Sequence, residues 1–275
     1  MIGSQVYRLL KQQYPKTTWG TDRTDKKFLL LDAKEPIQYL SVIHKKNPSI
    51  DYIINCIGIL RQDIIHHKQS IKDAIVVNAL FPHILTQWAN NQEAKIIHIS
   101  TDAIYASTTK IITENNQVMP NDEYSASKYL GEVLSDQVLN IRTSCLGLDS
   151  KGNSGLLQWI INTKQKIIPG YTKQIWSGCT TIQLAKLCAY LVEENYFFRL
   201  RKVTGVLNFT PIQSVSKYEI LKEFIAIKQL PISIHKETTL REQRKMDSKY
   251  NYTVPIDKTD IRSALIELVN NNRIR

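Results

Sequence analysis

The chain has 275 residues, 43% of them hydrophobic and 22% charged, which is the composition of a soluble globular protein with one large domain or two unequal ones. Its formal net charge is +11, but the basic residues are scattered and Lys is abundant together with Ile and Asn, so nucleic acid is not expected as a partner. The sequence shows neither the apolar core of a signal peptide nor a run of about 18 apolar residues, so we expect no membrane partner.

The four cysteines are Cys56, Cys145, Cys179 and Cys188, and none of them forms a CxxC pair. This spacing argues against a disulfide framework and against a zinc site. We therefore expect no metal, and the cysteine pattern fits a protein of the reducing cytoplasm.

Short apolar runs alternate with longer amphipathic ones through the first half of the chain. A helix at 4–12 is followed by a strand end at 19–23, and further strands are expected at 28–31, 51–56, 95–99 and 138–143. Helical patterns lie between these strands, notably at 73–90 and 123–137. The alternation predicts parallel pairing with right-handed crossovers, which is the doubly wound α/β class.

The pattern changes after about residue 145. Helices are expected at 155–164, 181–194, 217–227 and 259–270, separated by turns rich in Gly, Pro and Ser. We therefore divide the chain into a larger domain, residues 1–150, and a smaller lobe, residues 151–275, that is interleaved with the end of the sheet.

Tyr124 and Lys128 stand four residues apart in the sequence YSASK. On a helix this spacing places the phenol and the ammonium on one face, where the cation would lower the pKa of Tyr124. Tyr124 would then act as a general acid toward a carbonyl oxygen near neutral pH. The same spacing also begins at Tyr7 and at Tyr218, which read as ordinary helix-surface positions, so only the context identifies a functional pair.

Thr101 supplies this context. It follows the apolar run KIIHI and Ser100, and it precedes Asp102, so a buried strand ends in hydroxyls and an acid. Ligands of open parallel sheets bind beyond the carboxyl ends of the strands, where a hydroxyl stabilises a developing oxyanion. The alternative interpretation is a plain loop start, which would be favoured if Thr101 stood alone.

These residues belong to a set of motifs that resembles the extended short-chain dehydrogenase/reductase family, and within it the dTDP-4-dehydrorhamnose reductase group. The matching segments are IG at 2–3, NCIG at 55–58, VNALFP at 77–82, STD at 100–102, YSASK followed by GE at 124–132, and IRTS at 141–144. The resemblance covers nearly the whole chain. It implies a Rossmann-type nucleotide-binding domain in residues 1–150 and a substrate-binding lobe in residues 151–275.

The resemblance also implies roles for individual residues. Catalysis is assigned to Thr101, Tyr124 and Lys128. The cofactor-binding residues are Ile2, Gly3, Arg23, Asp32, Asn55, Gly58, Ser100, Tyr124 and Lys128. Thr101, Asp102 and Trp176 are assigned to the substrate. Asn78 resembles a supporting Asn of the family, and core packing of its helix explains that residue equally well.

Two departures from the family pattern concern the substrate. Cys145 follows the IRTS motif, where rhamnose reductases usually have Trp, so the identity of the sugar stays open. Trp176 is a different aromatic residue near the expected substrate, and it either stacks on the sugar or base or anchors the small lobe. Related dehydratases have Asp-Glu after the active Thr, whereas Ala103 follows Asp102 here, which favours carbonyl reduction over dehydration.

The segment 19–23 bears on the choice of cofactor. An acid at this strand end favours the free ribose of NAD, while an Arg accommodates the 2′-phosphate of NADP. Asp22 and Arg23 are both present, and the resemblance to family members with Arg in this loop favours NADP. Asp32 resembles an adenine-side acid of the family and is equally explained as a loop-initiating Asp.

The beginning of the chain departs from the family fingerprint, a strand followed by GxxGxxG. Met1, Ile2 and Gly3 supply only the last glycine and the two positions before it, so the first strand and most of the glycine-rich loop are absent. In the strand order 3-2-1-4-5-6 that strand is central. We therefore expect the natural chain to begin roughly ten or more residues upstream, or the reading frame to be decayed or mis-started.

The sequence as a whole predicts NAD(P)H-dependent reduction of a 4-keto group on a deoxy sugar linked to a nucleoside diphosphate. The nucleotide-sugar substrate is the expected partner, and a homodimer is allowed for. Two alternatives stay open: a non-catalytic dinucleotide-binding regulatory subunit and an epimerase on the same scaffold. The joint presence of Thr101, Tyr124 and Lys128 favours an enzyme over a binding subunit.

Overall fold

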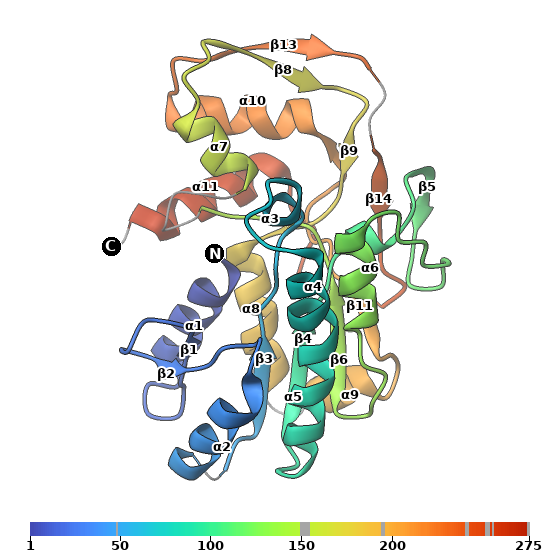
Figure 1. Ribbon diagram of the computed structural model, residues 1–275. Coiled ribbons are helices and arrows are strands. Elements are labelled where there is room, and N and C mark those ends of the chain that lie inside the picture. The colour runs from blue at the N-terminus through green and yellow to red at the C-terminus, as the bar shows by residue number, and fades with distance from the viewer. Residues whose placement is uncertain are drawn as a thin grey trace.

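The larger part of the molecule is built on a four-stranded parallel sheet (Figure 1). The computed structural model describes residues 1–47, 49–148, 155–193, 196–239, 242–250, 254 and 256–273. The order of the strands is β11–β6–β4–β3, formed by Val206–Asn208, Val138–Arg142, Lys95–Ile99 and Tyr52–Asn55. Every residue of β6 is buried, as expected for a parallel sheet that is covered on both faces.

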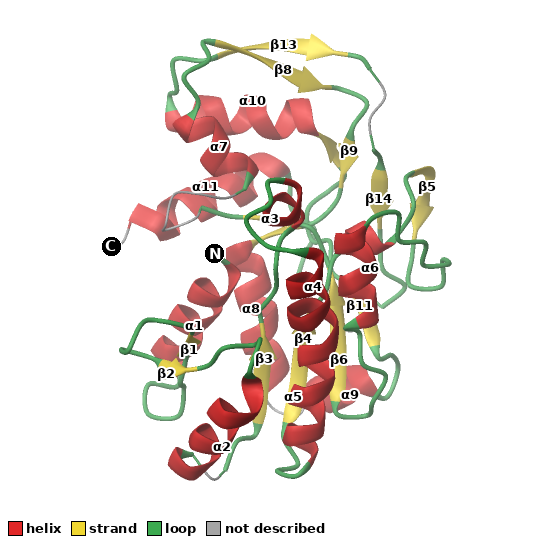
Figure 2. Cartoon of the chain, in the orientation of Figure 1, coloured by secondary structure: helices red, strands yellow, loops and turns green. Residues whose placement is uncertain are grey.

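Helices cover both faces of this sheet (Figure 2). The helices on one face are α2 (Pro36–Lys46), α4 (Ile71–Ala74), the π-helical segment η1 (Ile75–Leu80) and α5 (Phe81–Asn90). Their apolar side chains pack on Ile96 and Val138. The opposite face, which presents Ile97 and Leu139, packs against α1 (Ile2–Gln13) and α8 (Thr181–Val192). The doubly wound arrangement predicted from the sequence is confirmed.

A second pair of parallel strands is separate from the main sheet. It consists of β1 (Thr21–Asp22) and β2 (Leu29–Leu30). Within the part of the chain that the structure describes, β3 pairs with β4 and has no ladder with β1. In the first hundred residues the described parallel strands therefore lie in two separate sheets.

The smaller lobe forms the upper part of the view in Figure 1. Its elements are α7 (Leu156–Asn162), β8 (Ile167–Tyr171), α10 (Lys217–Lys228), β13 (Ser233–Glu237) and α11 (Ile261–Arg273). They surround a second apolar core that includes Leu157, Phe224 and Leu265. Because α8 and β11 return to the main sheet between these elements, the lobe is interleaved with the larger part.

The remaining elements are short. They are α3 (Arg61–Ile65), η2 (Asp102–Ile104), β5 (Thr108–Ile112), α6 (Glu123–Leu130), β7 (Cys145–Leu146), β9 (Ile175–Trp176), β10 (Cys179–Thr180), α9 (Tyr196–Arg201), β12 (Val215–Ser216) and β14 (Arg244–Met246). β14 pairs with β5, which links the end of the small lobe to the segment after Thr101. β9 pairs with β12, and β7 with β10.

The structure corrects one predicted helix and extends the sheet. The helix expected at 123–137 ends at Leu130, and its C-cap is Gly131, a residue that disfavours continuation of a helix. Gly131 packs so closely on η1 that a Cβ there would lie 1.9 Å from the Asn78 carbonyl oxygen. β11 was not predicted, since its three residues carry too short an apolar run. The predicted domain boundary at 150–151 and the last residue of the helix expected at 181–194 lie outside the described residues.

Of the helices in the described residues, none combines the length and the apolar character needed to span a bilayer. This part of the structure is a layered α/β arrangement with two apolar cores, one in each part of the molecule.

We predict that the packing of β6 dominates the stability of the main sheet. Leu139 is 0% exposed and Leu134, five residues earlier, is 85% exposed, so the two leucines form a matched pair. Leu139→Ala should lower the free energy of unfolding by about 2–5 kcal/mol, because it removes buried apolar atoms and leaves a cavity. Leu134→Ala should change it by less than about 0.5 kcal/mol. Urea unfolding of both variants measures this, and equal losses would contradict the assigned packing.

Candidate active site

The predicted catalytic residues meet at the carboxyl edge of the main sheet. Thr101 follows β4, two residues after its last residue Ile99. Helix α6 lies across this edge and carries Tyr124 and Lys128. The Lys128 ammonium donates a hydrogen bond of 2.7 Å to the carbonyl oxygen of Ile99, and its side chain is buried. The helix is thereby fixed to the end of the strand that presents Thr101.

The first turn of α6 is held by its N-cap, Asp122. The Asp122 carboxylate accepts a hydrogen bond of 2.7 Å from the backbone N–H of Ser125. Burial acts to raise the pKa of Asp122, but hydrogen bonds from Ser125 and the Arg61 guanidinium lower it overall. An ionised N-cap stabilises the helix start, and Tyr124 is the second residue of this helix.

The acidity of Tyr124 differs from the prediction. We expected the Lys128 cation to lower the pKa of this phenol, but burial raises the pKa of Tyr124 to about 12. A side-chain hydrogen bond with Thr101 acts in the lowering direction and is outweighed. Lys128 does not lower this pKa, because its ammonium is directed to the Ile99 carbonyl. Tyr124 is therefore protonated at neutral pH, the form that a general acid needs.

Lys128 is shifted in the opposite direction. Burial lowers the pKa of Lys128 from 10.5 to about 8, while the charge of Glu132 acts to raise it. Gly58 lies beside this side chain, since a Cβ on Gly58 would lie 3.7 Å from the Lys128 Nζ, an ordinary contact, and 3.3 Å from the Asn78 Oδ1, a tight one. Gly58 of the NCIG loop thus lies next to both Asn78 and Lys128.

Two asparagines determine the shape of the NCIG loop. The Asn78 Oδ1 accepts from the backbone N–H of Ile59 at 2.7 Å, and its Nδ2 donates to the Ile59 carbonyl and to Ser127. The Asn55 Oδ1 accepts from the backbone N–H of Ile57, and its Nδ2 lies 3.0 Å from His98 Nδ1. Both amides are used inside the protein, so they act on a ligand through the loop that they hold.

The remaining predicted cofactor residues lie at the ends of other elements. Ile2 and Gly3 begin α1, which has no side-chain N-cap, and a Cβ on Gly3 would lie 3.5 Å from the Cβ of Cys56 just after β3. Arg23 is exposed and directly follows β1. Asp32 follows β2 and accepts a hydrogen bond of 2.9 Å from the Lys34 N–H, which begins the turn into α2.

The predicted substrate residues occupy different surroundings. Burial raises the pKa of Asp102, which hydrogen-bonds with Thr101, while the Arg244 cation acts to lower it. Trp176 is 8% exposed and packs in the core of the small lobe, and its Nε1 donates to the Ser144 Oγ at 2.8 Å. Trp176 thus occupies an anchoring position, and its contact with a substrate stays a prediction.

An ion-pair network beside Tyr124 was missed by the sequence analysis. Arg61 at the start of α3 pairs with Asp122 and, at 3.4 Å, with Glu242, which also accepts from Arg244 at 3.0 Å. The Arg244 Nε donates to the Tyr105 carbonyl at 2.9 Å. The network joins the larger part to the segment that leads into β14. No sequence signal identifies it, because Glu242 lies 120 residues after Asp122.

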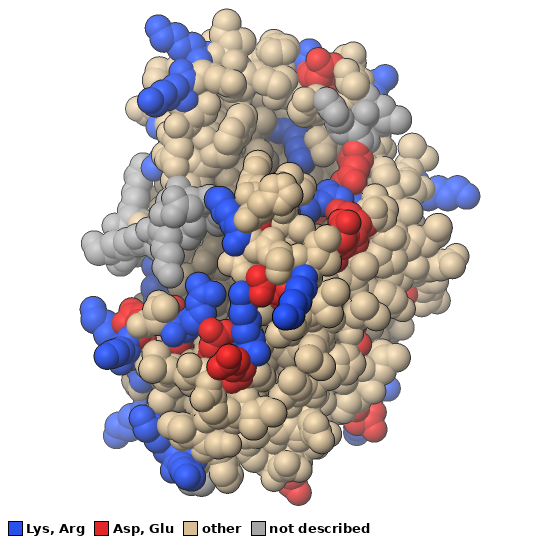
Figure 3. Space-filling model, in the orientation of Figure 1, with Lys and Arg blue, Asp and Glu red and all other residues tan. Residues whose placement is uncertain are grey.

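Cations and anions are mixed on the surface as well. On the face shown in Figure 3, Asp and Glu side chains lie close to Lys and Arg side chains where the small lobe meets the larger part. Among the described residues, no group of three or more His, Cys, Asp or Glu side chains is arranged to hold a metal ion.

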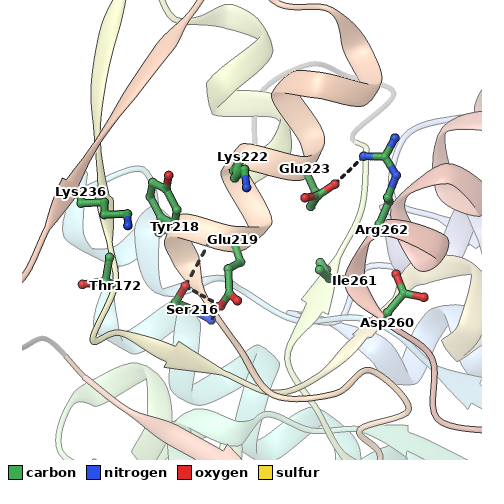
Figure 4. A pocket seen from close by; sticks show the side chains of 10 residues that line it. All are labelled: Thr172, Ser216, Tyr218, Glu219, Lys222, Glu223, Lys236, Asp260, Ile261 and Arg262. Carbon is green, nitrogen blue, oxygen red and sulfur yellow. Dashed lines mark hydrogen bonds and ion pairs between the residues drawn. The ribbon is translucent and has the colours of Figure 1, made fainter.

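A recess of about 560 Å³ lies on the small lobe, between α10, β13 and the start of α11 (Figure 4). Three cations, Lys222, Lys236 and Arg262, line it together with Glu219, Glu223 and Asp260. The charges are balanced, and Arg262 is paired with Glu223. The recess also contains Tyr218 and Lys222, which have the same spacing as Tyr124 and Lys128 but lie outside the site at the sheet edge.

The sequence matches the family model of the RmlD substrate binding domain over residues 1–247. Among curated proteins, no sequence matches this chain significantly. The fold is also found in solved structures. A dTDP-4-dehydrorhamnose reductase from Clostridium acetobutylicum is 20% identical with a TM-score of 0.78, and the match covers 99% of this chain and 96% of that one.

Two further structures have the same fold. A dTDP-4-dehydrorhamnose reductase from Bacillus anthracis in complex with NADP is 18% identical, with a TM-score of 0.79 and coverage of 98% and 95%. A dTDP-glucose 4,6-dehydratase from the same organism in complex with NAD is 15% identical, with a TM-score of 0.75 and coverage of 98% and 92%. At these identities the likeness establishes the fold.

The burial of Lys128 predicts a pH-dependent contribution to stability. Between pH 8 and 10.5 the unfolded chain keeps a proton on Lys128 that the folded protein has lost, so this residue makes stability rise with pH across that window. Lys128→Met should remove this part of the slope and leave the rest of the profile unchanged. Urea unfolding of both proteins at pH 7 to 10.5 measures it, and parallel profiles would contradict the assignment.

Proposed function

The chain belongs to the RmlD substrate binding domain family, and on that premise we propose that it uses NADPH to reduce the 4-keto group of a nucleoside-diphosphate-linked deoxy sugar. Two solved proteins of similar fold are dTDP-4-dehydrorhamnose reductases, one of them in complex with NADP. The observation that carries the proposal is the meeting of Thr101, Tyr124 and buried Lys128 at the carboxyl edge of the sheet.

The residues at this edge fit a nicotinamide dinucleotide. The N-terminus of α1 has no side-chain cap, so its backbone N–H groups are available to phosphate oxygens. Lys128 lies against Gly58, in a position to hold the nicotinamide ribose. Arg23 is exposed at the end of β1, where it would contact the adenosine 2′-phosphate. When bound, the dinucleotide supplies the hydride for the carbonyl carbon.

The protein contributes the proton and the positioning. Tyr124 is protonated at neutral pH, so its hydroxyl donates a proton to the carbonyl oxygen as that oxygen gains charge. Thr101, which interacts with the same phenol, donates a hydrogen bond to this oxygen. Lys128 acts through the ribose that it holds and not on Tyr124, because its ammonium is directed to the Ile99 carbonyl. Asp102 contacts the sugar beside Thr101.

One prediction from this function concerns Tyr124. Tyr124→Phe keeps the ring and its packing but removes the proton donor, so turnover should fall by about 10²–10⁴-fold with the fold unchanged. NADPH oxidation is measured against a small panel of nucleotide-linked 4-keto sugars. The matched control is Tyr218→Phe on α10, which lies in the small-lobe recess and should keep full turnover (Figure 4). Equal turnover of wild type and Tyr124→Phe would support a binding subunit instead.

Another prediction concerns the choice of cofactor. Arg23→Ala should weaken NADPH binding far more than NADH binding, because a guanidinium forms charge-assisted hydrogen bonds with a phosphate that NADH lacks. Fluorescence titration of both dinucleotides measures this. Lys26→Ala, an exposed cation in the same loop, serves as the control for general charge. A parallel loss for both dinucleotides would show that Arg23 does not recognise the phosphate.

A further inference from the structure

A buried ion pair between Glu132 and Arg142 lies directly behind the site. The two side chains are 3% and 6% exposed, and the Arg142 Nη2 and Nε lie 2.6 and 2.9 Å from oxygens of the carboxylate. Removing two charges from water is costly, and replacing such a pair with apolar residues is often neutral for stability or favourable. Stability alone is therefore a weak explanation for this pair, and its contacts indicate another role.

The Glu132 carboxylate connects three elements of the site. Glu132 follows the end of α6, Arg142 ends β6, and Ser100 follows β4. The Ser100 hydroxyl donates a hydrogen bond of 2.6 Å to the same carboxylate. Because Ser100 immediately precedes Thr101, the carboxylate fixes the backbone from which the Thr101 hydroxyl is presented.

Arg142 extends these contacts to the other end of the same segment. Its Nη1 donates a hydrogen bond of 2.6 Å to the hydroxyl of Tyr105, which is buried and donates in turn to Asn208 on β11 at 3.2 Å. The ion pair therefore holds residues 100 and 105, one on each side of Thr101 and Asp102. The segment 100–105, which contains the predicted substrate residues Thr101 and Asp102, is therefore hydrogen-bonded at both ends to one ion pair.

The same carboxylate acts on Lys128, one helical turn before it in the sequence. The other titratable groups that interact with Lys128 are Cys56 and His98. Burial raises the pKa of Cys56 to about 12 and lowers that of His98 well below its ordinary value, so both are neutral between pH 7 and 10. Of the described groups that act on Lys128, Glu132 is thus the one whose charge favours the ammonium near neutral pH.

We propose that Glu132 is a positioning residue of the reaction: it accepts the hydrogen bond from Ser100 and thereby fixes the backbone that presents Thr101, and its charge favours the ammonium form of Lys128. This inference rests on the proposed function for its consequence in turnover, but its effect on Lys128 exists in the free protein. Burial alone favours the neutral amine, and the Ile99 carbonyl accepts a hydrogen bond from either form. The Glu132 charge acts against this effect of burial and favours the ammonium.

The test uses variants that fold. Glu132→Gln leaves the Arg142 guanidinium buried without a counterion, which costs about 3–5 kcal/mol, so it is combined with Arg142→Met. The control is the double variant Glu267→Gln with Lys186→Met, which removes an ion pair between α8 and α11. Circular dichroism and urea unfolding confirm that each protein is folded.

The main readout is the titration of Lys128 in the free protein, followed by its ¹³Cε chemical shift and assigned with Lys128→Arg. In Glu132→Gln/Arg142→Met the midpoint should fall by about one pH unit or more, because the Glu132 charge that favours the ammonium is gone, whereas Arg142 is not among the groups whose charge acts on Lys128. The control should keep the wild-type midpoint. In the steady-state assay, the alkaline limb of the kcat profile should move down by the same amount.

An unchanged Lys128 midpoint in the folded double variant would overturn the proposal and leave Glu132 with a structural role only. The Lys128 titration needs no substrate, so the role of Glu132 and the proposed function are tested independently. If wild-type protein oxidises no NADPH with any sugar of the panel, the proposed function is wrong, while the Lys128 titration still decides what Glu132 does.

Discussion

The burial of the Lys128 ammonium at the end of β4 is the constraint on which the site depends. A lysine in this position loses hydration, and the protein compensates with one carbonyl oxygen and one carboxylate charge. Both partners must be placed by packing, since neither is exposed to solvent that could replace it. The helix that carries Lys128, the strand that ends at Ile99 and the turn that carries Glu132 therefore have to assemble together.

Close packing explains why α6 and its neighbour have unusual local structure. Gly131 ends α6 where it touches Asn78 of η1, and any side chain at this glycine would collide with the Asn78 carbonyl. The π-helical turn of η1 presents the Asn78 side chain to Ser127 of α6 and to the NCIG loop. Irregular helical turns of this kind are frequent at functional sites. Here the irregularity brings a loop, a helix and Lys128 to one point.

The sequence alone predicted the layer architecture, and together with the family resemblance it named the candidate site residues. Apolar runs at 51–56, 95–99 and 138–143 are long and continuous, because strands buried on both faces need apolar side chains throughout. The spacing of Tyr124 and Lys128 occurs at three places in the chain, and only the motif around Thr101 distinguished the pair that lies at the sheet edge. Local periodicity and the rule that parallel strands end at the same edge contain this information.

Only the tertiary structure decided the electrostatics and the connection between the parts. The rise in the Tyr124 pKa follows from burial, and the network of Arg61, Asp122 and Glu242 joins segments far apart in the chain. The role of Glu132 depends on Ser100 and Arg142, which approach it through the sheet. Charge interactions depend on the distances between groups and on their burial. Neither quantity follows from the periodicity of a sequence, so both are known only from the folded structure.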